Sequence, residues 1–523
     1  METLQAPHPE EGITGLASDI KDSADGPCSY DKRAAHGEDP MGRMILKRIF
    51  LMAGALVILA GTSCAVNPVT GRQEISLISE EKEIEIGRNS DPEILRKYGA
   101  YPDPALQNYI SSIGEALARN SHRPSIAYHF KVVDSPAVNA FALPGGYVYV
   151  TRGMLAYLGS EAELAGVMGH EIGHVTERHA VQQLTAAFGL QLTSMILSAA
   201  VKGGGEFSRL TDVLSSGIIN GYGRGKELSA DRLGQDYMFK TGYDPEASVS
   251  FLTALQRTEG DPLDPVSHWL AGTHPYASER IRKAQVHARE LDPQMLVKTR
   301  NRERYLSQIN GMVFGAGERD GLLAGRRYQN RFFRVSCEVP EGWTVRTGRD
   351  TWAAETPDKK YRMQFRLEEL KEAVDLNSFA FRMEQGMELN HGELLSRGRR
   401  NGMETLMVRY RAASGSVILG EYLLRDRVGI ALYGMVPEVS TGQLTEEWRR
   451  VEESIQTLSE SEAGAIPLAR IRIHQVRPGD TFSGLAMEFL KDPKKAKEIA
   501  EINGMSPDAS PALGSAIKVI TYY

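Results

Sequence analysis

Cysteine is scarce in this sequence of 523 residues, and long hydrophobic runs are few. Only three cysteines occur, and their spacing fits no zinc-binding cysteine pattern: they are Cys28, Cys64 and Cys337. If Cys64 is modified as argued below, the mature chain keeps one free thiol and has no internal disulfide. No stretch after Cys64 reaches about eighteen apolar residues, so the sequence predicts no membrane-spanning helix beyond that point.

Neither positive nor negative side chains are in large excess. Lys and Arg number 61 against 67 Asp and Glu, which gives a formal net charge of −6. Nothing in this balance points to a nucleic-acid partner, because such proteins carry a marked basic excess. The length is enough for about three domains.

The stretch GHEIGH follows helical signals. Ser160 and Glu163 form an S-x-x-E capping box, after which apolar residues recur at helical spacing. Because each residue turns an α-helix by about 100°, His170 and His174 lie on one face with Glu171 beside them. Two imidazoles at this spacing can bind one zinc ion, and the carboxylate can face a water. A buried helix without a metal is the alternative interpretation.

A third metal ligand has two candidates. His179 is nine residues past the first histidine of the motif, so a continuous helix would turn it away from the metal. In KELSADRLGQDYM, Glu227 and Asp231 are four apart and share one face of a second predicted helix. The small Ser229 and Ala230 between them would let this helix approach another closely. A pair of solvated carboxylates is the alternative, but two histidines and one glutamate leave zinc the open position that catalysis requires.

Four sequence blocks occur in the order typical of one family: NAFALPGGYVYVTRGML, HEIGH, ELSAD and THPYASERI. Across about residues 80–291 the chain therefore resembles the HtpX/BepA-type zinc metallopeptidases, the group that includes CAAX prenyl proteases. The resemblance implies a mainly helical, zincin-like (gluzincin) domain with a small β-sheet and one zinc ion per chain. It also implies individual roles: zinc ligands His170, His174 and Glu227, the general base Glu171, and Asp231 as a support for the ligands.

The block THPYASERI adds a residue near the metal by the same resemblance. His274 would stabilise the developing oxyanion, cap the open zinc position as a regulatory ligand, or only close the helix that follows. Arg280 comes at a spacing that lets a short helix bring both side chains toward the site. We favour the regulatory cap.

Two segments before the motif, YHFKVVDS and GYVYVTRG, alternate as strands, with ALPGG as a turn between them. The resemblance makes residues 147–151 an edge strand along which an extended substrate would lie; its residues include Tyr147, Val148, Tyr149 and Val150. An edge strand offers unpaired backbone groups and so binds many peptides. A simple hairpin is the alternative.

The stretch MILKRIFLMAGALVILAGTSC predicts a lipoprotein signal. Lys47 and Arg48 give a positive start, about twelve apolar residues follow, and small residues precede Cys64. The apolar run is too short to span a membrane comfortably. Residues 1–63 are therefore a predicted extension and signal peptide, and Cys64 is the predicted lipidation site. Ala65 resembles outer-membrane sorting, which predicts a lipid-anchored protein of the periplasm, in the outer membrane.

The expected fold class is α+β, with a peptidase domain at residues 64–300. Strand-like segments and two helices predict an α/β accessory domain within residues 301–458, and F-x-V-x-x-x-x-P-x-G-W is similar to the opening of PsbP-like domains. A linker at 459–470 leads to residues 471–523, which resemble a βααβ LysM module whose first helix starts at Gly479 and Asp480. LysM modules bind peptidoglycan glycan; a packing module is the alternative.

These features predict a zinc metalloendopeptidase of the bacterial envelope. It would cleave misfolded or misassembled envelope proteins by zinc-activated water, with Glu171 as general base. A chaperone-like assembly factor with low turnover and a peptidoglycan-directed peptidase are the alternatives. The intact ligand set favours an active enzyme, and the strand platform suits a long peptide. Expected partners are envelope proteins, the membrane through the lipid anchor, and peptidoglycan through the LysM-like module, with no nucleic acid.

Overall fold

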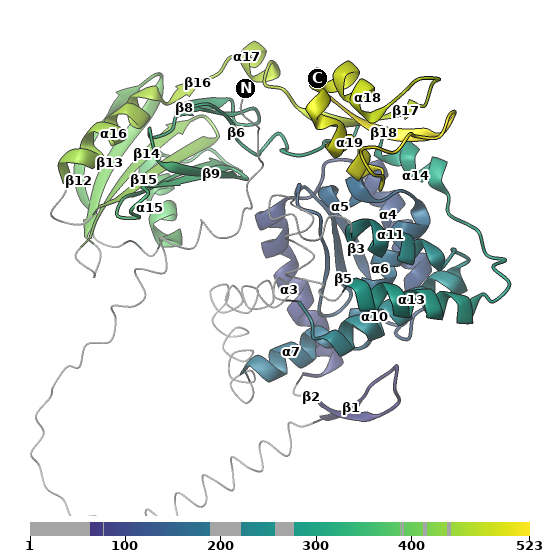
Figure 1. The fold of residues 1–523 in the computed structure, drawn as a ribbon. Helices are drawn as coiled ribbons and strands as arrows, with labels where there is room; N and C mark the ends of the chain where they lie inside the picture. The colour runs from purple at the N-terminus through teal and green to yellow at the C-terminus, as the bar shows by residue number, and fades with distance from the viewer. Residues whose placement is uncertain are drawn as a thin grey trace, which may run out of the picture. The chain divides into compact units, whose positions relative to one another are not determined.

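The computed structural model describes residues 63–76, 78–188, 221–256, 277–387, 389, 392–411, 416–436 and 441–522. The chain divides into two compact units. One unit contains the described residues up to Phe314 together with Ala469–Tyr522 and is called the peptidase unit because it includes the predicted peptidase domain; the other, the accessory unit, is Gly315–Leu468 (Figure 1). The apolar part of the predicted signal segment and His274 lie outside the described residues. Helices and sheets in both units confirm the predicted α+β class.

The peptidase unit is mainly helical and contains one three-stranded sheet. The sheet has the order β3-β5-β4, with β5 parallel to β3 and antiparallel to β4. Its strands are β3 (His129–Val133), β4 (Ala140–Leu143) and β5 (Tyr147–Thr151). A separate hairpin precedes them, β1 (Ser63–Val66) and β2 (Gln73–Ser76). The helices are α3 (Glu80–Tyr98), α4 (Pro104–Arg119), α5 (Arg152–Tyr157), α6 (Glu161–Thr176), α7 (His179–Phe188), α10 (Arg224–Thr241), α11 (Glu246–Gln256), α13 (Ala277–Leu291) and α14 (Arg302–Ile309).

Helix α6 carries the H-E-x-x-H motif and is buried along almost its whole length. It packs against α4, α10, α11 and β4, so apolar neighbours cover several of its sides. Ser160 is its N-cap and accepts a hydrogen bond from the Glu163 backbone N–H at 3.2 Å. The Glu163 carboxylate accepts from the backbone N–H of Gly159 at 2.6 Å, one residue earlier than a reciprocal capping box requires. The predicted start of the helix at Ser160 is therefore confirmed, but the Glu163 side chain accepts from Gly159 and not from Ser160.

Small residues let α6 and α10 approach each other closely. A Cβ atom added to Gly169 would lie 2.9 Å from the carbonyl oxygen of Gly234, and one added to Gly173 would lie 3.0 Å from Ala230. Both distances are too short for a larger side chain, so the two backbones are in direct contact. The predicted close approach at Ala230 is confirmed, and it brings the motif face of α6 against the Glu227 face of α10.

The accessory unit is built on a seven-stranded antiparallel sheet of order β12-β13-β14-β15-β11-β10-β9. A second sheet has the order β16-β8-β7-β6. Trp352 and Phe365 stack at 5.6 Å in one apolar core cluster of this unit. The elements are β6 (Leu322–Ala324), β7 (Arg327–Asn330), β8 (Val335–Glu338), β9 (Thr344–Gly348), β10 (Thr351–Glu355), β11 (Arg362–Glu369), α15 (Leu376–Gly386), β12 (Glu393–Arg400), β13 (Met403–Arg411), β14 (Val417–Arg425), β15 (Val428–Val436), α16 (Thr441–Ser454), β16 (Gln456–Thr457) and α17 (Glu460–Gly464).

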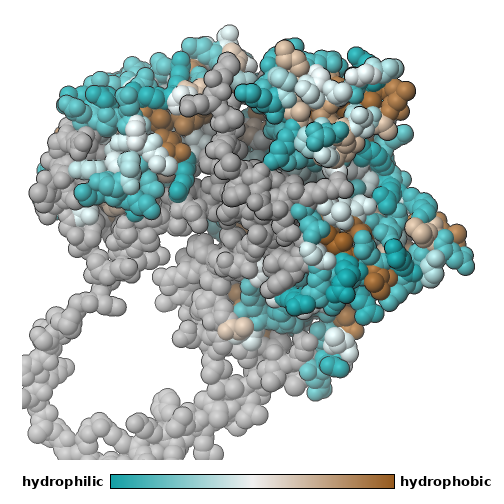
Figure 2. All heavy atoms as spheres, in the orientation of Figure 1, coloured by the Kyte–Doolittle hydropathy of each residue, from teal (hydrophilic) through white to brown (hydrophobic). Residues whose placement is uncertain are grey.

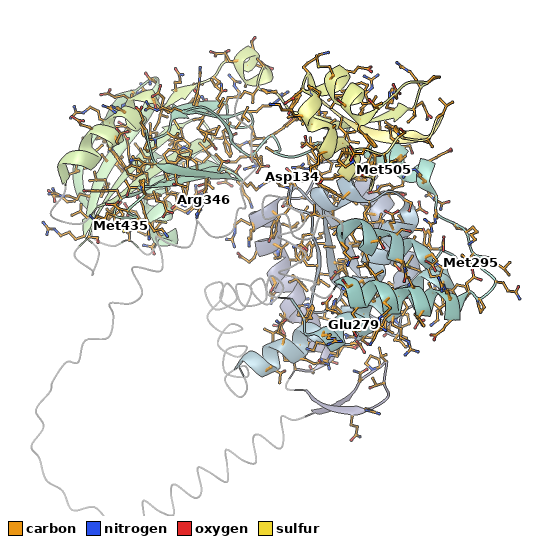
Figure 3. The ribbon with its side chains drawn as sticks, viewed as in Figure 1. Asp134, Glu279, Met295, Arg346, Met435 and Met505 are labelled. Carbon is orange, nitrogen blue, oxygen red and sulfur yellow. The ribbon has the colours of Figure 1, made fainter. Side chains whose placement is uncertain are left out.

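The C-terminal module has the predicted strand–helix–helix–strand order. It consists of β17 (Ala469–Gln475), α18 (Phe482–Leu490), the short 3₁₀ helix η1 (Pro493–Lys495), α19 (Ala496–Ile502) and β18 (Ala516–Tyr522). Thr481, not Asp480, caps α18, because its side chain accepts from the Gly484 N–H while Asp480 accepts from Arg477. Met505, labelled in Figure 3, packs against the apolar core of this module.

The C-terminal module packs on the peptidase region. The Lys518 ammonium on β18 is fully buried and donates to the carbonyl oxygens of Ala156 and Leu158, at 2.8 and 2.7 Å. Arg302 on α14 donates both to Gly159 and to Ala516 of β18. These bonds hold the loop between α5 and α6, which leads directly into the motif helix.

The described surface is largely hydrophilic in the view of Figure 2, with small scattered apolar areas. Leu296 and Leu513 are among its exposed large apolar side chains, at 73% and 69% exposure. Within the ranges given above, none of the helices is both long enough and apolar enough to cross a bilayer.

Candidate metal centre

His170, His174 and Glu227 converge from α6 and α10. The two imidazole Nε2 atoms are 3.0 Å apart; His170 Nε2 lies 3.6 Å from Oε2 of Glu227, and His174 Nε2 lies 3.6 Å from Oε1 of Glu227. Tetrahedral zinc with bonds of about 2.0–2.1 Å sets its ligand atoms about 3.3–3.4 Å apart. The observed separations of 3.0 and 3.6 Å lie below and above this ideal separation. Among the residues that the structure describes, His170, His174 and Glu227 form the group of side chains that could hold a metal ion. The two nitrogens and the Glu227 carboxylate are therefore a set of ligands that suits zinc.

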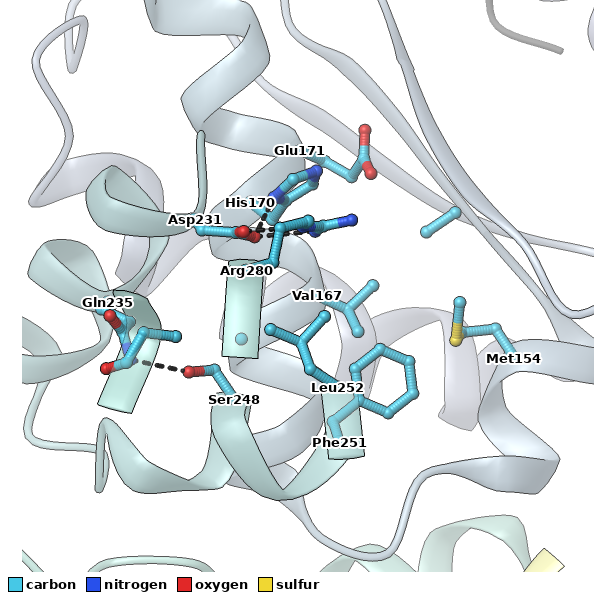
Figure 4. A pocket seen from close by; sticks show the side chains of 13 residues that line it. Met154, Val167, His170, Glu171, Asp231, Gln235, Ser248, Phe251, Leu252 and Arg280 are labelled. Carbon is cyan, nitrogen blue, oxygen red and sulfur yellow. Dashed lines mark hydrogen bonds and ion pairs between the residues drawn. The ribbon is translucent and has the colours of Figure 1, made fainter. Parts of the chain in front are cut away.

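Asp231 and Arg280 lie behind two of these groups (Figure 4). The Asp231 carboxylate is 2.9 Å from His170 Nδ1, and Arg280 donates to both oxygens of Asp231 at 2.7 Å. Arg280 also lies 3.1 Å from Glu227. Burial raises the pKa of Asp231, but the Arg280 guanidinium and the His170 contact outweigh it and hold that pKa well below its usual range. Asp231 is therefore an ionised acceptor that orients the His170 ring.

His179 does not face away, and the prediction that it would is wrong. His179 Nδ1 lies 2.7 Å from His174 Nδ1, and its Nε2 lies 3.1 Å from the Glu177 carboxylate. The prediction assumed one continuous helix, but α6 ends at Thr176 and α7 begins at His179. Between them Arg178 adopts a left-handed conformation with φ of 55°, so the phase of the first helix no longer applies.

Tyr222 is a site residue that the sequence reasoning missed. Its ring stacks on His174 with centroids 4.2 Å apart and an interplanar angle of 26°. Burial raises the pKa of its hydroxyl, and the neighbouring Glu171 and Glu227 carboxylates raise it further. Tyr222 lies two residues before the start of α10, next to the N-cap residue Gly223. No helix or strand pattern in the sequence includes it, so the sequence alone gave no reason to assign it to the site.

One cavity joins the metal centre to an apolar region. Glu171 is buried, and both it and His170 line this cavity; in Figure 4 the Glu171 carboxylate projects beside the His170 ring. The other end is lined by apolar side chains from α5, α6 and α11: Met154, Val167, Phe251 and Leu252. The arrangement offers a carboxylate next to the metal position and an apolar recess adjoining both.

The predicted edge strand at Tyr147–Thr151 is wrong. β5 lies in the middle of its sheet and pairs with β3 on one side and β4 on the other, so the backbone groups of Tyr147, Val148, Tyr149 and Val150 are already flanked by neighbours. The antiparallel strand β4, which includes the first two residues of the ALPGG stretch, takes an edge position instead. β4 also packs on α6, and its Ala140 lines the cavity.

For two other predicted site residues, Cys64 and His274, the structure does not describe the side chain. The backbone of Cys64 lies in β1, paired with Ile75 of β2. His274 falls outside the described residues.

Comparisons with known proteins agree with this geometry. Residues 104–288 match the model of Peptidase family M48. A beta-barrel assembly-enhancing protease of Yersinia pestis is 31% identical over 226 residues, which cover 41% of this chain and 46% of the relative. The mitochondrial metalloendopeptidase OMA1 of Schizosaccharomyces pombe is 26% identical, over 46% of this chain and 72% of the relative. The chain thus spans about half the length of the bacterial relative.

Among solved structures, the solution structure of cyanobacterial PsbP from Synechocystis covers 28% of this chain and 98% of its own. The sequence identity is 12% and the TM-score 0.20, so the PsbP-like resemblance of the accessory unit stays a prediction. The family match, by contrast, spans the strands and helices that bring His170, His174, Glu227 and Arg280 together. Residues 104–288 are therefore similar to peptidase family M48.

Proposed function

We propose that this chain is a zinc-dependent endopeptidase that acts on proteins of the bacterial cell envelope. The observation that supports it best is the convergence of two histidine Nε2 atoms and the Glu227 carboxylate, with Glu171 lining the same cavity. The names of the bacterial relatives, beta-barrel assembly-enhancing proteases, support the envelope as the place of action. Misfolded or misassembled envelope proteins are the proposed substrates.

The zinc ligands in this proposal are His170, His174 and Glu227. Zinc, when bound there, supplies the positive charge that lowers the pKa of a water molecule to about 7 and polarises a peptide carbonyl. Glu171 is the general base: its carboxylate takes the proton from the attacking water and returns it to the leaving amine. Asp231, held by Arg280, keeps the His170 ring aimed at the metal position.

β4 replaces β5 as the proposed substrate platform. A peptide added to the outer edge of β4 would continue the sheet through backbone hydrogen bonds. Ala140 on this strand lines the cavity that also contains Glu171, so a strand bound there passes next to the general base. Backbone binding of this kind suits many sequences, as a quality-control protease requires.

The Glu171→Gln variant tests the enzymatic proposal. Loss of a general base typically lowers the rate by about 100- to 10,000-fold, while zinc content is expected to stay at one ion per chain. Wild type and variant would be incubated with casein and with peptidoglycan sacculi, with and without a chelator. Casein cleavage that survives both the chelator and the substitution would refute the proposal, and cleavage of sacculi alone would redirect it to peptidoglycan.

The same proposal places the protein on the periplasmic face of the outer membrane through a lipid on Cys64, with the C-terminal module in contact with peptidoglycan. The Cys64→Ser variant is expected to move from the membrane fraction to the soluble periplasmic fraction. Sedimentation of the purified full chain with sacculi tests the glycan contact. A Cys64→Ser variant that still pellets with membranes contradicts the lipid anchor.

A further inference from the structure

One chain of polar contacts leads from the metal centre to a carboxylate that the proposed mechanism does not use. It runs from His174 to His179 and on to Glu177, with separations of 2.7 and 3.1 Å. All three side chains are buried, with exposures of 2%, 4% and 7%. A buried chain of this kind has a definite direction, because each ring nitrogen is either a donor or an acceptor.

The direction follows from the ligand geometry. His174 Nε2 faces His170 and Glu227, so it must be free of a proton to bind zinc. The neutral His174 ring then carries its proton on Nδ1 and donates it to Nδ1 of His179. His179 in turn carries its proton on Nε2, which faces the Glu177 carboxylate at 3.1 Å.

We propose that His179 is a positioning residue for the metal, which holds His174 in the tautomer that leaves Nε2 able to bind zinc. With the opposite direction, His179 would donate to His174 and place the His174 proton on Nε2, where it blocks the metal. Glu177 excludes this direction, since an ionised carboxylate accepts only and requires the proton on His179 Nε2. The inference rests on the metal site of the proposed function and extends it to this chain.

The backbone places His179 with the help of a distant arginine cluster. Arg178 donates to the Glu83 carboxylate and to the carbonyl oxygen of Ile78, both at 2.7 Å. Glu83 is also bound by Arg123 at 2.9 Å. A left-handed backbone is unfavourable for a residue other than glycine, and these partly buried contacts hold Arg178 in that conformation. These contacts therefore fix the turn between α6 and α7, and His179, the first residue of α7, follows it directly.

The two zinc histidines are thus supported by different chemistry. His170 has an anionic acceptor, Asp231, at 2.9 Å, whereas His174 has a neutral imidazole at 2.7 Å. Tyr222 stacks on His174 and lies 5.6 Å from His179 between ring centroids, so the orientation of both rings is restricted from a second side.

The test compares three substitutions at one position. His179→Leu keeps a similar shape but removes the acceptor, and is expected to lower zinc affinity about 10- to 100-fold. His179→Asn puts an amide oxygen close to the place of Nδ1, where it can accept from His174, and is expected to restore affinity to within a few-fold of wild type. His179→Gln puts its polar group near Nε2 instead and is expected to behave like the Leu variant.

Zinc affinity would be measured by competition with a chelating indicator, and the melting temperature of each zinc-free protein would be recorded alongside. His122→Leu is the matched control, because its Nδ1 bonds Tyr237 at 2.8 Å in the same unit but lies outside the ligand set. An Asn variant as weak as the Leu variant, or a Leu variant with wild-type affinity, would overturn the inference. Wild type that binds no zinc would instead overturn the proposed function.

Discussion

Each unit of the molecule contains a cluster of two carboxylates and one arginine in which one carboxylate is almost completely buried. In the peptidase unit Arg280 contacts Asp231 and Glu227; in the accessory unit Arg400 contacts Glu421 and Glu452. Each cluster has one more negative than positive charge when both carboxylates are ionised. The clusters differ in what lies next to that excess charge.

In the peptidase unit the carboxylates face two histidine rings with converging nitrogens, a place for a second cation. In the accessory unit, burial and the neighbouring Glu452 carboxylate together raise the pKa of Glu421 to about 7, against the effect of Arg400. There the excess charge is removed by a proton. A buried acid with a shifted pKa therefore does not identify an active site by itself; the arrangement of metal-binding nitrogens around it does.

Removal of the arginine should give the largest difference in stability between the two clusters. In the zinc-free protein, Arg280→Met leaves two buried carboxylates without a cation and should lower the free energy of unfolding of its unit by about 3–5 kcal/mol. Arg400→Met should cost less, because its side chain is 26% exposed against 5% for Arg280 and Glu421 can take up a proton. Urea unfolding followed by circular dichroism measures both. Equal losses in the free energy of unfolding for the two variants would contradict the proposed difference between the clusters.

Zinc should stabilise one unit only. At a free zinc concentration of about 100 times the dissociation constant, the peptidase unit should gain about 2.7 kcal/mol. The accessory unit should unfold at the same temperature with zinc or with a chelator, since its described part contains no comparable group of ligands. Scanning calorimetry separates the two transitions, and the His170→Ala variant is the control in which zinc should have no effect. A zinc-dependent shift in the accessory transition would contradict the comparison.

Glu421 should make the accessory unit less stable as pH rises. Its pKa is about 7 in the folded chain and about 4.5 when unfolded, so the folded state binds more protons between these values. The stabilising contribution is complete below pH 4.5 and is lost as pH rises through 7, an effect on the order of 2 kcal/mol. The Glu421→Gln variant should lose this slope and be the more stable protein at pH 8. A slope unchanged by the substitution would assign it to another group.

The smallest effect concerns Cys337 in the accessory unit. Burial raises the pKa of this thiol to about 12, although the Trp352 indole N–H, 3.3 Å from Sγ, lowers it somewhat. The thiolate is the reactive form, so a thiol reagent at pH 8 should label Cys337 only after denaturation. Labelling is followed by mass spectrometry in buffer and in urea. Rapid reaction of the native protein would show that a second reactive group exists outside the metal centre.

Helical periodicity, together with the family resemblance, predicted much of the metal centre. His170, His174, Glu227 and Asp231 are each placed by a four-residue spacing, which a helix converts into one face. The close approach of α6 and α10 also follows from local composition, because small residues such as Ala230 stand where the backbones meet. For these residues, sequence distance and spatial distance are related by one regular geometry.

The failures have the opposite cause. The change of direction at Arg178 depends on Glu83, nearly a hundred residues earlier in the chain, so no local pattern could bring His179 back to His174. The central place of β5 depends on pairing with both β3 and β4, and strand alternation cannot tell a central strand from an edge strand. The position of Tyr222 beside His174 is likewise a result of tertiary packing.

The buried contact of Lys518 has a consequence for the order of synthesis. A ribosome makes the loop at Ala156 and Leu158, and the whole H-E-x-x-H helix, more than three hundred residues before it makes the lysine that binds that loop. A nascent chain that stops before Ala469 lacks the last strand pair and leaves those carbonyl oxygens without this donor. The peptidase unit is thus assembled from segments on both sides of the accessory unit, and its motif helix gains this support only after more than three hundred further residues have been translated.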